Sequence, residues 1–358
     1  MKSIWKEQAT YIYVFNVGRG LSVFIRTSMN HGILYDLGCS DDFSPFLFIE
    51  ENLMPHLIKL KHGEAEFELA QVIVSHPHSD HMSEIDKLGK SLKKVNLLTC
   101  PHDKESSDEK VDFSRIKNIP GTEGLLETYK NLYKDRNLPL QTVLYDGNTY
   151  VPGVEYGIYY MRPPKVAVVH DKDDLKYANG LSLLFYYRFK EHSILIPGDI
   201  TPEVFDEIMN ERNGLEKRYS AFDPTQRREH PDWHEKTGDQ PSLKHNLGKY
   251  GLTIYLAPHH GLESGYFSEL GSYLKNGKPQ LNVISEKRHW NDNDGNIHSG
   301  YSGEDASLGL DVMIGGVKKW CNSVNTSQGY HYLIAMDGTG TLPRVYGEKD
   351  PINLLGKI

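Results

Sequence analysis

Runs of apolar residues, broken by polar and glycine-containing turns, divide the first part of this sequence into strands and helices. Three runs rich in valine, isoleucine and aromatic residues predict β-strands at residues 11–17, 21–26 and 32–35. The segment Gly18-Arg19-Gly20 between the first two predicts a tight hairpin turn. The apolar run 69–74 predicts a buried strand, and a helix is expected from about Ser83 to Lys94.

Strands and helices continue in the second part of the sequence. Strands are expected at residues 181–189, 192–196, 252–257, 281–284, 330–335 and 342–346. Thr201-Pro202 predicts the start of a helix that ends near Asn213. Residues 215–249 are charged and poor in aliphatic side chains, which predicts an inserted lid or surface loop. We therefore expect one domain over residues 1–358, with this insertion and a C-terminal extension at 286–358.

The composition is that of an ordinary globular protein, with 38% hydrophobic and 11% aromatic residues. A formal net charge of −8 argues against broad, non-specific binding to a nucleic-acid backbone. The sequence has no run of about 18 apolar residues and no apolar stretch at its charged N-terminus, so neither a membrane span nor a signal peptide is expected. Cys39, Cys100 and Cys321 are odd in number and widely spaced, which is typical of reduced cysteines in a cytoplasmic protein.

The pattern H-x-H-x-D-H directly follows the predicted strand at 69–74 and indicates a metal site. His76 and His78 are one residue apart, so on an extended backbone both side chains can converge on one ion. Asp80 and His81 follow at a shifted phase, which indicates a second, adjacent site. Imidazole and carboxylate ligands in this mixture suit zinc or another borderline divalent ion. A simpler alternative is that Asp80 caps a helix and the histidines are ordinary polar loop residues.

Three further acid or histidine features follow a predicted strand in the same way. They are Asp36, Asp199 and the pair His259-His260. Loop residues that converge at one edge of a rigid sheet commonly form active sites. The sequence therefore predicts one site assembled from four loops.

The motifs DLG, HPHSDH, PGD and PHHG, in this order, resemble those of the metallo-β-lactamase superfamily of metal-dependent hydrolases. The longer phrases FNVGRGLSVFI, SHPHSDHMSEI, NGLSLLF, ILIPGD and APHHGLESG are similar to the soluble hydrolase domain of the ComEC-like competence proteins. The resemblance runs from about Tyr11 to Ser285. It implies an α/β fold of four layers, an αββα sandwich in which each half supplies one sheet and its covering helices.

The resemblance also implies two adjacent sites for divalent ions, zinc or manganese. His76 and His78 would bind the first ion, while Asp80 and His81 would bind the second. Asp199 would bridge the two ions and fix their positions.

The remaining roles concern the second site and the residues around it. One histidine of the 259–260 pair would complete that site. We take His259 as this ligand and His260, together with Asp80, as catalytic, and we leave the order of the pair open. Asp36 would orient the histidine loop from behind, as carboxylates near metal ligands often do.

One position departs from the superfamily pattern. Most members have a third histidine for the first ion shortly before the strand that leads to the bridging aspartate, whereas this sequence has Asn179 there, as the ComEC-like group does. His170 is the nearest histidine upstream and could complete the site. Without it, the first ion would be weakly held, manganese-preferring or dependent on the substrate for a ligand.

The leading functional hypothesis is hydrolysis of a phosphodiester through a metal-bound hydroxide, by a nuclease or nucleotide phosphodiesterase that acts on DNA or a nucleotide. A protein partner in a multi-gene system, such as phage defence, fits the same hypothesis. One alternative is a hydrolase of a carboxylic ester, lactone, amide or thioester on the same site. Another is a non-catalytic scaffold that binds a protein.

Two sets of side chains would help to separate these hypotheses. A cleft lined by basic residues would favour phosphate, and the candidates are Lys93, Lys94, Lys287 and Arg288. Rings beside the loops of the site could stack on nucleic-acid bases, and the candidates are Tyr266, Phe267, His289 and Trp290.

Overall fold

The computed structural model describes the greater part of the chain: residues 5–6, 8–62, 65–101, 111–117, 119–135, 154–210, 219–220, 242–286 and 297–357. Most of the predicted insertion at 215–249 therefore lies outside the described residues. The same is true of four side chains that the sequence proposed for substrate contact: Lys287, Arg288, His289 and Trp290.

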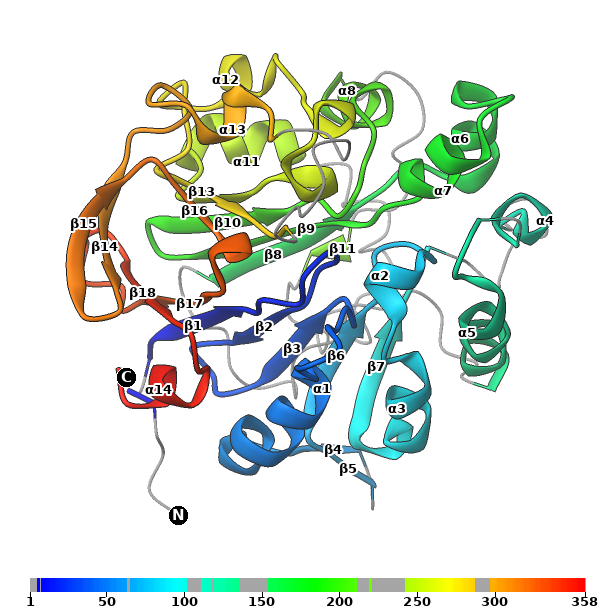
Figure 1. The fold of residues 1–358 in the computed structure, drawn as a ribbon, viewed down its shortest axis with the longest axis horizontal. Coiled ribbons are helices and arrows are strands. Elements are labelled where there is room, and N and C mark those ends of the chain that lie inside the picture. The colour runs from blue at the N-terminus through cyan, green and yellow to red at the C-terminus, as the bar shows by residue number, and fades with distance from the viewer. Residues whose placement is uncertain are drawn as a thin grey trace, which may run out of the picture.

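The described strands form two large sheets and a separate hairpin, as Figure 1 shows. The first sheet has the order β15-β14-β18-β17-β1-β2-β3-β6-β7. Its strands are β1 Thr10–Val14, β2 Val23–Arg26, β3 Gly32–Tyr35, β6 Leu69–Ile73, β7 Val95–Thr99, β14 Leu310–Ile314, β15 Val317–Cys321, β17 His331–Met336 and β18 Arg344–Glu348. The hairpin consists of β4 Leu60–His62 and β5 Ala65–Phe67.

The second sheet has the order β11-β8-β9-β10-β12-β13-β16. Its described strands are β8 Val154–Tyr159, β9 Leu184–Phe189, β10 His192–Ile196, β11 Tyr219–Ser220, β12 Ile254–Leu256, β13 Leu281–Ile284 and β16 Ser323–Asn325. The C-terminal segment contributes to both sheets, since β16 joins this one and β17 pairs with β1 of the first. The expected C-terminal extension is thus part of the layered core.

The two sheets pack face to face around a common apolar core. Side chains alternate between the faces of a strand, so Ile12 and Val14 of β1 point into this core while Tyr11 and Tyr13 point to the outer layer. Phe185 of β9 in the second sheet belongs to the same inner core. Because both faces of the central strands are buried, their sequences read as continuous apolar runs.

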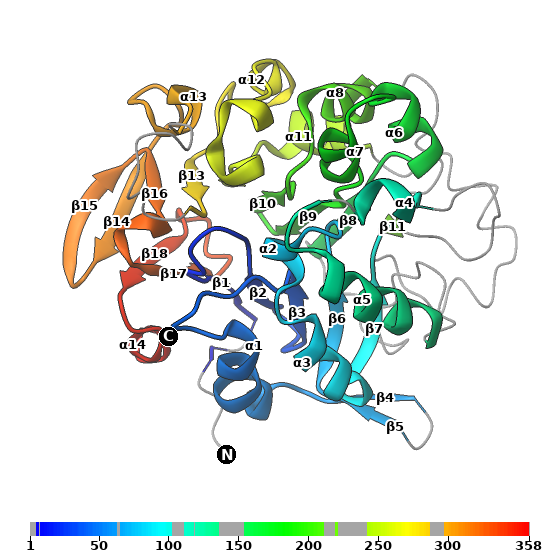
Figure 2. The same ribbon diagram turned by 45° about the vertical axis from the view of Figure 1, so that its right-hand side comes forward.

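Helices cover the outer face of each sheet. They are α1 Pro45–Phe48, η1 Ile49–Leu53, η2 Met54–His56, α2 Ser79–Met82, α3 Ile85–Lys90, η3 Leu92–Lys94, α4 Phe113–Ile116, α5 Glu123–Asp135, α6 Pro163–Val169, α7 Asp174–Gly180, α8 Pro202–Asn210, α11 Leu243–Tyr250, η6 Pro258–Gly261, η7 Glu263–Gly265, α12 Leu270–Tyr273, α13 Ser299–Ser302, η8 Thr326–Gln328 and α14 Ile352–Leu355. Figure 1 shows α1 and α3 below the first sheet and α8, α11 and α12 above the second, and Figure 2 shows the same elements turned by 45° about the vertical axis. The predicted αββα sandwich is confirmed. In the part of the chain that is described, no helix has the length and apolar character needed to cross a membrane.

The single helix predicted from Ser83 to Lys94 is instead two short helices, α3 and η3, and a third, α2, precedes them within the histidine motif. The chain breaks after α2 because its backbone groups bind elsewhere. The carbonyl oxygen of Asp80 accepts a hydrogen bond from the amide of Leu21 at 3.4 Å, and the amide of Glu84 donates to Leu37 at 3.0 Å. These contacts replace the helical bond from residue 84 to residue 80. The segment 215–249, which was predicted to be a lid or surface loop, also differs from the prediction at its end, because residues from Leu243 onward form helix α11.

The parallel strands bring the site loops together. In the first sheet β3, β6 and β7 are parallel, and in the second sheet β10, β12 and β13 are parallel. Asp36 follows β3, the histidine motif follows β6, Asp199 follows β10 and the pair His259-His260 follows β12. Each predicted site loop therefore leaves the carboxyl end of a parallel strand, where ligands commonly bind in open α/β sheets.

Candidate metal centre

Six side chains from these loops form two groups, in each of which the potential ligand atoms lie within 4.8 Å of one another. The first group is His76, His78 and Asp199, and the second is Asp80, His81 and His260. All except Asp80 are buried. Six convergent side chains of this kind have the chemistry of a site for two divalent ions.

In the first group, ring nitrogens of two histidines face each other. Nε2 of His76 lies 3.0 Å from Nδ1 of His78, and the same Nε2 lies 3.9 Å from Oδ2 of Asp199. An ion bound at the usual distance of about 2.1 Å from each ligand requires ligand atoms at roughly this separation.

In the second group, carboxylate oxygens lie beside two histidines. Oδ2 of Asp80 lies 3.3 Å from Nε2 of His260, and Oδ1 of Asp199 lies 3.1 Å from Nε2 of His81. Oδ2 of Asp199 is also 3.6 Å from His260. Asp199 therefore lies between the two groups.

Asp36 holds the histidine loop from behind. Its fully buried carboxylate accepts hydrogen bonds from the Ser75 amide at 2.6 Å, the Ser75 hydroxyl at 2.8 Å and Nδ1 of His81 at 2.7 Å. A carboxylate can only accept here, so the proton of His81 is on Nδ1 and the lone pair of Nε2 faces the centre. Asp36 has φ of 60°, a left-handed conformation that aspartate and asparagine tolerate better than most residues.

The second group has a similar support at His260. Nδ1 of His260 donates to the carbonyl oxygen of Ser285 at 2.9 Å, which directs its Nε2 toward the centre. The buried Nε2 atoms of His81 and His260 have no hydrogen-bond partner among the described residues, although carboxylate oxygens lie nearby. Buried polar atoms without a partner are costly, and a bound cation would satisfy both. The side chains present therefore fit divalent ions.

Burial keeps the histidines of the first group neutral. It lowers the pKa of His76 well below its usual value and lowers the pKa of His78 to about 4. Neutral imidazole is the form that coordinates a metal, so no proton has to leave these two side chains.

The second group carries charge. Burial alone would lower the pKa of His81 and His260, but the carboxylates around them outweigh it and raise the pKa of both. Burial would also raise the pKa of Asp80 and Asp199, yet the neighbouring histidines lower it. Without metal, this group is held by imidazolium–carboxylate pairs, and a divalent ion would replace their protons.

The two histidines of the 259–260 pair, whose order the sequence left open, lie in different positions relative to the second group. His260 belongs to the second group, whereas His259 lies at its rim with 15% of its side chain exposed. Nδ1 of His259 contacts the Ser264 hydroxyl at 2.6 Å, and its Nε2 is 3.9 Å from Asp199. The two neighbours point differently because both have positive φ in a tight turn, at 47° and 57°.

The two uncertain residues of the first site lie in different environments. The side chain of Asn179 is buried at the end of α7, and its oxygen Oδ1 has no partner among the described residues. His170 is also buried, but its Nε2 binds the hydroxyl of Thr201 at 2.8 Å. His170 belongs to neither group of possible ligands in the described part of the chain.

The lysines proposed for the cleft lie at the wrong end of the sheet. Lys93 and Lys94 directly precede β7, whose first residue pairs with the first residue of β6. The histidine motif follows the last residue of β6, so the whole strand separates it from these lysines. Lys94 is also engaged, since its ammonium group lies 2.6 Å from Glu50.

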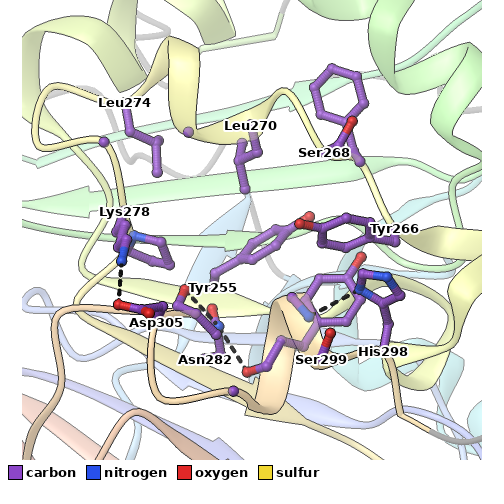
Figure 3. A pocket seen from close by; sticks show the side chains of 18 of the residues that line it. Tyr255, Tyr266, Ser268, Leu270, Leu274, Lys278, Asn282, His298, Ser299 and Asp305 are labelled. Atoms are coloured by element: carbon purple, nitrogen blue, oxygen red, sulfur yellow. Dashed lines mark hydrogen bonds and ion pairs between the residues drawn. The ribbon is translucent and has the colours of Figure 1, made fainter.

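The two aromatic candidates that the structure describes are engaged in packing. Tyr266 stacks on His298 with 3.7 Å between ring centroids, and Phe267 packs on Phe205 at 4.7 Å. Figure 3 shows Tyr266 and His298 at one end of a cavity of about 650 Å³ on the outer, helix-covered side of the second sheet. A wall of this cavity adjoins the histidine turn: the hydroxyl of Tyr301 donates to the carbonyl of Gly265 at 2.8 Å, and Gly265 packs so closely on the turn that a Cβ atom there would lie 2.9 Å from Cβ of His259.

Sequence reasoning missed the turn at Gly18-Arg19-Gly20 as a part of the site. A Cβ atom at Gly20 would overlap the carbonyl oxygen of Asp80, so only glycine allows this approach. The hydroxyl of Ser285 donates to the carbonyl of Gly20 at 2.8 Å. The two glycines on either side of Arg19 could have indicated a close approach to the site, but an ordinary hairpin turn explained them equally well.

A comparison with protein families gives a match in the N-terminal part of the chain. Residues 15–155 match the family model of the metallo-beta-lactamase superfamily. The match includes Asp36 and the histidine motif but ends before Asp199. No curated protein sequence gives a significant match.

Two solved structures resemble this one. The metallo-beta-lactamase fold protein YhfI from Bacillus subtilis has 10% sequence identity and a TM-score of 0.36, over 79% of this chain and 88% of that chain. The long form RNase Z from yeast has 11% identity and a TM-score of 0.32, over 82% of this chain and 40% of that chain.

Proposed function

We propose that this chain, in which residues 15–155 match the family model of the metallo-β-lactamase superfamily, is a two-metal hydrolase of phosphodiesters. The superfamily consists mostly of metal-dependent hydrolases. The observation that carries the proposal is the pair of three-residue groups on either side of Asp199. Two ions close together suit phosphodiester cleavage because they can balance charge on both the attacking and the leaving oxygen.

The proposed ligands follow from the geometry. His76 and His78 would hold one ion, and Asp80, His81 and His260 would hold the other. Asp199 would be shared between the two ions. His260 takes the place of His259 in this assignment, because its Nε2 is the one directed at Asp80. When bound, the ions would supply the Lewis acidity that makes water a nucleophile near neutral pH and neutralises a phosphoryl group.

The protein would contribute orientation and proton transfer. Asp36 and the Ser285 carbonyl keep both imidazoles of the second group in the tautomer that can bind metal. His259 lies at the rim beside Asp199, with one ring nitrogen on Ser264 and the other directed at the centre. We propose that His259 contacts the leaving oxygen and donates a proton to it.

The first site lacks a third imidazole, and we propose that Asn179 takes that place. Its buried side-chain oxygen has no partner among the described residues, as a metal ligand or a substrate contact would require. An amide oxygen is a harder ligand than imidazole and suits manganese or magnesium better than zinc. The first site would therefore favour manganese.

The test combines metal analysis with hydrolysis. Purified protein is assayed on bis-p-nitrophenyl phosphate and on single- and double-stranded DNA, after loading with Mn²⁺ or Zn²⁺. We expect bound metal and an activity that Asp80→Ala abolishes. Lys59→Ala is the control, because Lys59 is exposed and pairs with Glu66 of the distant hairpin.

Other outcomes would change the proposal. Hydrolysis of p-nitrophenyl acetate without any phosphodiester hydrolysis would assign the site to carboxylic esters. A wild-type protein that binds no metal and cleaves neither substrate would favour a binding scaffold, and the hydrolase proposal would be wrong.

A further inference from the structure

The turn Gly18-Arg19-Gly20 is fixed beside the second group of the candidate centre. On one side Gly20 packs against the carbonyl of Asp80, and the next residue in the chain donates its amide to that carbonyl at 3.4 Å. On the other side the carbonyl of Gly20 accepts from the hydroxyl of Ser285, whose own carbonyl holds His260. The turn thus touches the supports of both Asp80 and His260.

The backbone of this turn has little freedom to move away. Gly18 and Gly20 adopt φ of 69° and 129°, values that residues other than glycine rarely adopt. Gly38 packs close by, where a Cβ atom would lie 2.6 Å from the same Asp80 carbonyl. Three chain segments therefore meet at Asp80, and Arg19 projects from one of them.

Arg19 has an exposed side chain, with no hydrogen bond or ion pair to any residue that the structure describes. Consecutive Cα atoms are about 3.8 Å apart, so its backbone is one step from the residue that packs on Asp80. An extended arginine side chain is longer than this step. It is therefore long enough to bring its guanidinium group to the carboxylate of Asp80, which is 24% exposed.

Three other cations among the residues described before β8 are already committed. Lys87 lies 2.6 Å from Glu84, and Lys94 lies 2.6 Å from Glu50. Arg26 is buried and donates to backbone carbonyls at the N-terminal end of β1. Arg26 and Arg115 are both engaged, the latter with Asp174 at 2.6 Å, so Arg19 is the one arginine described before β8 that has no hydrogen-bond or ion-pair partner among the described residues.

We propose that Arg19 binds the anionic phosphate oxygen of the substrate and gives the site its preference for anionic esters over neutral ones. This inference rests on the proposed hydrolase function and names the residue that would select the substrate. Guanidinium suits the task because its planar fork can donate two hydrogen bonds to a phosphate and stays charged at any physiological pH.

The test compares three variants of the metal-loaded full chain. Arg19→Gln removes the charge, and Arg19→Lys keeps the charge but loses the fork. Arg344→Gln is the matched control, because Arg344 is an exposed arginine paired with Asp337 at 3.8 Å. Each is assayed on bis-p-nitrophenyl phosphate, which is anionic, and on p-nitrophenyl acetate, which is neutral.

Arg19→Gln should raise KM for the anionic diester by about 10- to 100-fold relative to Arg344→Gln, as loss of a charge-assisted hydrogen bond implies. Arg19→Lys should lie between these two variants. Metal content and the rate with the neutral ester should stay unchanged. Equal KM values for Arg19→Gln and Arg344→Gln would overturn the inference while leaving the proposed function intact.

A binding measurement separates the two proposals. If wild type cleaves no phosphodiester, the proposed function fails, but inorganic phosphate can still be titrated into each metal-loaded variant by calorimetry. Weaker phosphate binding by Arg19→Gln than by Arg344→Gln supports the inference. Equal binding overturns it. Arg19→Lys, compared by circular dichroism with wild type, keeps the test valid if the glutamine variant does not fold.

Discussion

Replacing Asp36 by asparagine should weaken metal binding at the second site without changing any ligand. The two side chains have the same shape, and asparagine tolerates the φ of 60° at this position. The change replaces one acceptor oxygen by an NH₂ donor. Asp36 accepts three hydrogen bonds, two from Ser75 and one from His81, so an asparagine cannot satisfy all three donors.

The size of the effect follows from the two ways in which asparagine can be oriented. With its oxygen toward His81, its NH₂ group faces the amide of Ser75, which loses its partner at 2.6 Å. With its oxygen toward Ser75, its NH₂ group faces Nδ1 of His81, which must then carry its proton on Nε2 and cannot bind metal. A buried donor left unpaired costs about 1–3 kcal/mol. At about 1.4 kcal/mol per factor of ten, metal affinity should fall by about 10- to 100-fold.

The assay is competition between the protein and a chromophoric chelator for Zn²⁺ and for Mn²⁺. Glu84→Gln is the matched control, since Glu84 is a buried carboxylate of the same loop that accepts from the amide of Phe46 at 2.8 Å. It should lower thermal stability without changing metal affinity. If Asp36→Asn binds both metals as tightly as Glu84→Gln, the argument that Asp36 fixes the tautomer of His81 is refuted.

Three other predictions concern different parts of the chain. His260→Ala should lose about one equivalent of metal by elemental analysis. His259→Ala should keep its metal but lose phosphodiester hydrolysis. The reverse result would make His259 the metal ligand and His260 the catalytic residue. Gly20→Ala should destabilise the fold by about 1–3 kcal/mol in urea unfolding, because the new Cβ atom would overlap the Asp80 carbonyl oxygen and the backbone has positive φ. Gly248→Ala, at an exposed position of helix α11, should instead stabilise the fold by about 0.5–1 kcal/mol. Equal effects of the two substitutions on stability would contradict the contact between Gly20 and Asp80. Burial lowers the pKa of His331 to about 4, so the folded protein keeps it neutral while the unfolded chain binds a proton below about pH 6.5. Stability of metal-free protein should therefore fall by up to about 3 kcal/mol from pH 6.5 to 4, and His331→Phe should flatten this fall; parallel pH profiles would show that another group is responsible.

The sequence predicted the layers well where strands are buried on both faces. Strand β10 at His192–Ile196 and strand β13 at Leu281–Ile284 begin and end as expected, because their apolar runs stop at turn residues. The helix after the histidine motif was wrong in extent. Within the predicted span, α3 ends at Lys90, where the amide of Ser91 is shared between the carbonyl oxygens of Lys87 and Leu88, and the tighter helix η3 follows.

The candidate site shows the same division. The sequence predicted the types of ligand and the loops that carry them, because each ligand motif directly follows an apolar run that forms a strand. The order of His259 and His260 was not readable, because it depends on two successive positive φ values in one turn. The distance of Lys93 from the site was also hidden, since it follows from the register of β6 and β7 rather than from closeness in sequence.

The histidine motif therefore contributes unequally to the two halves of the centre. Asp80 and His81 meet a second histidine, and both imidazoles of that group are held through Nδ1 by Asp36 and by a backbone carbonyl. In the first group, Nδ1 of His76 is held by the Ser75 hydroxyl at 3.0 Å, but Nδ1 of His78 contacts Nε2 of His76 rather than a supporting group. These two histidines share Asp199 and, by our proposal, an amide oxygen. Preorganised ligands lose less entropy on binding an ion than ligands that must first be brought together. The second half should thus retain its ion more tightly, and the first half is the place where a substrate oxygen would find an open coordination position.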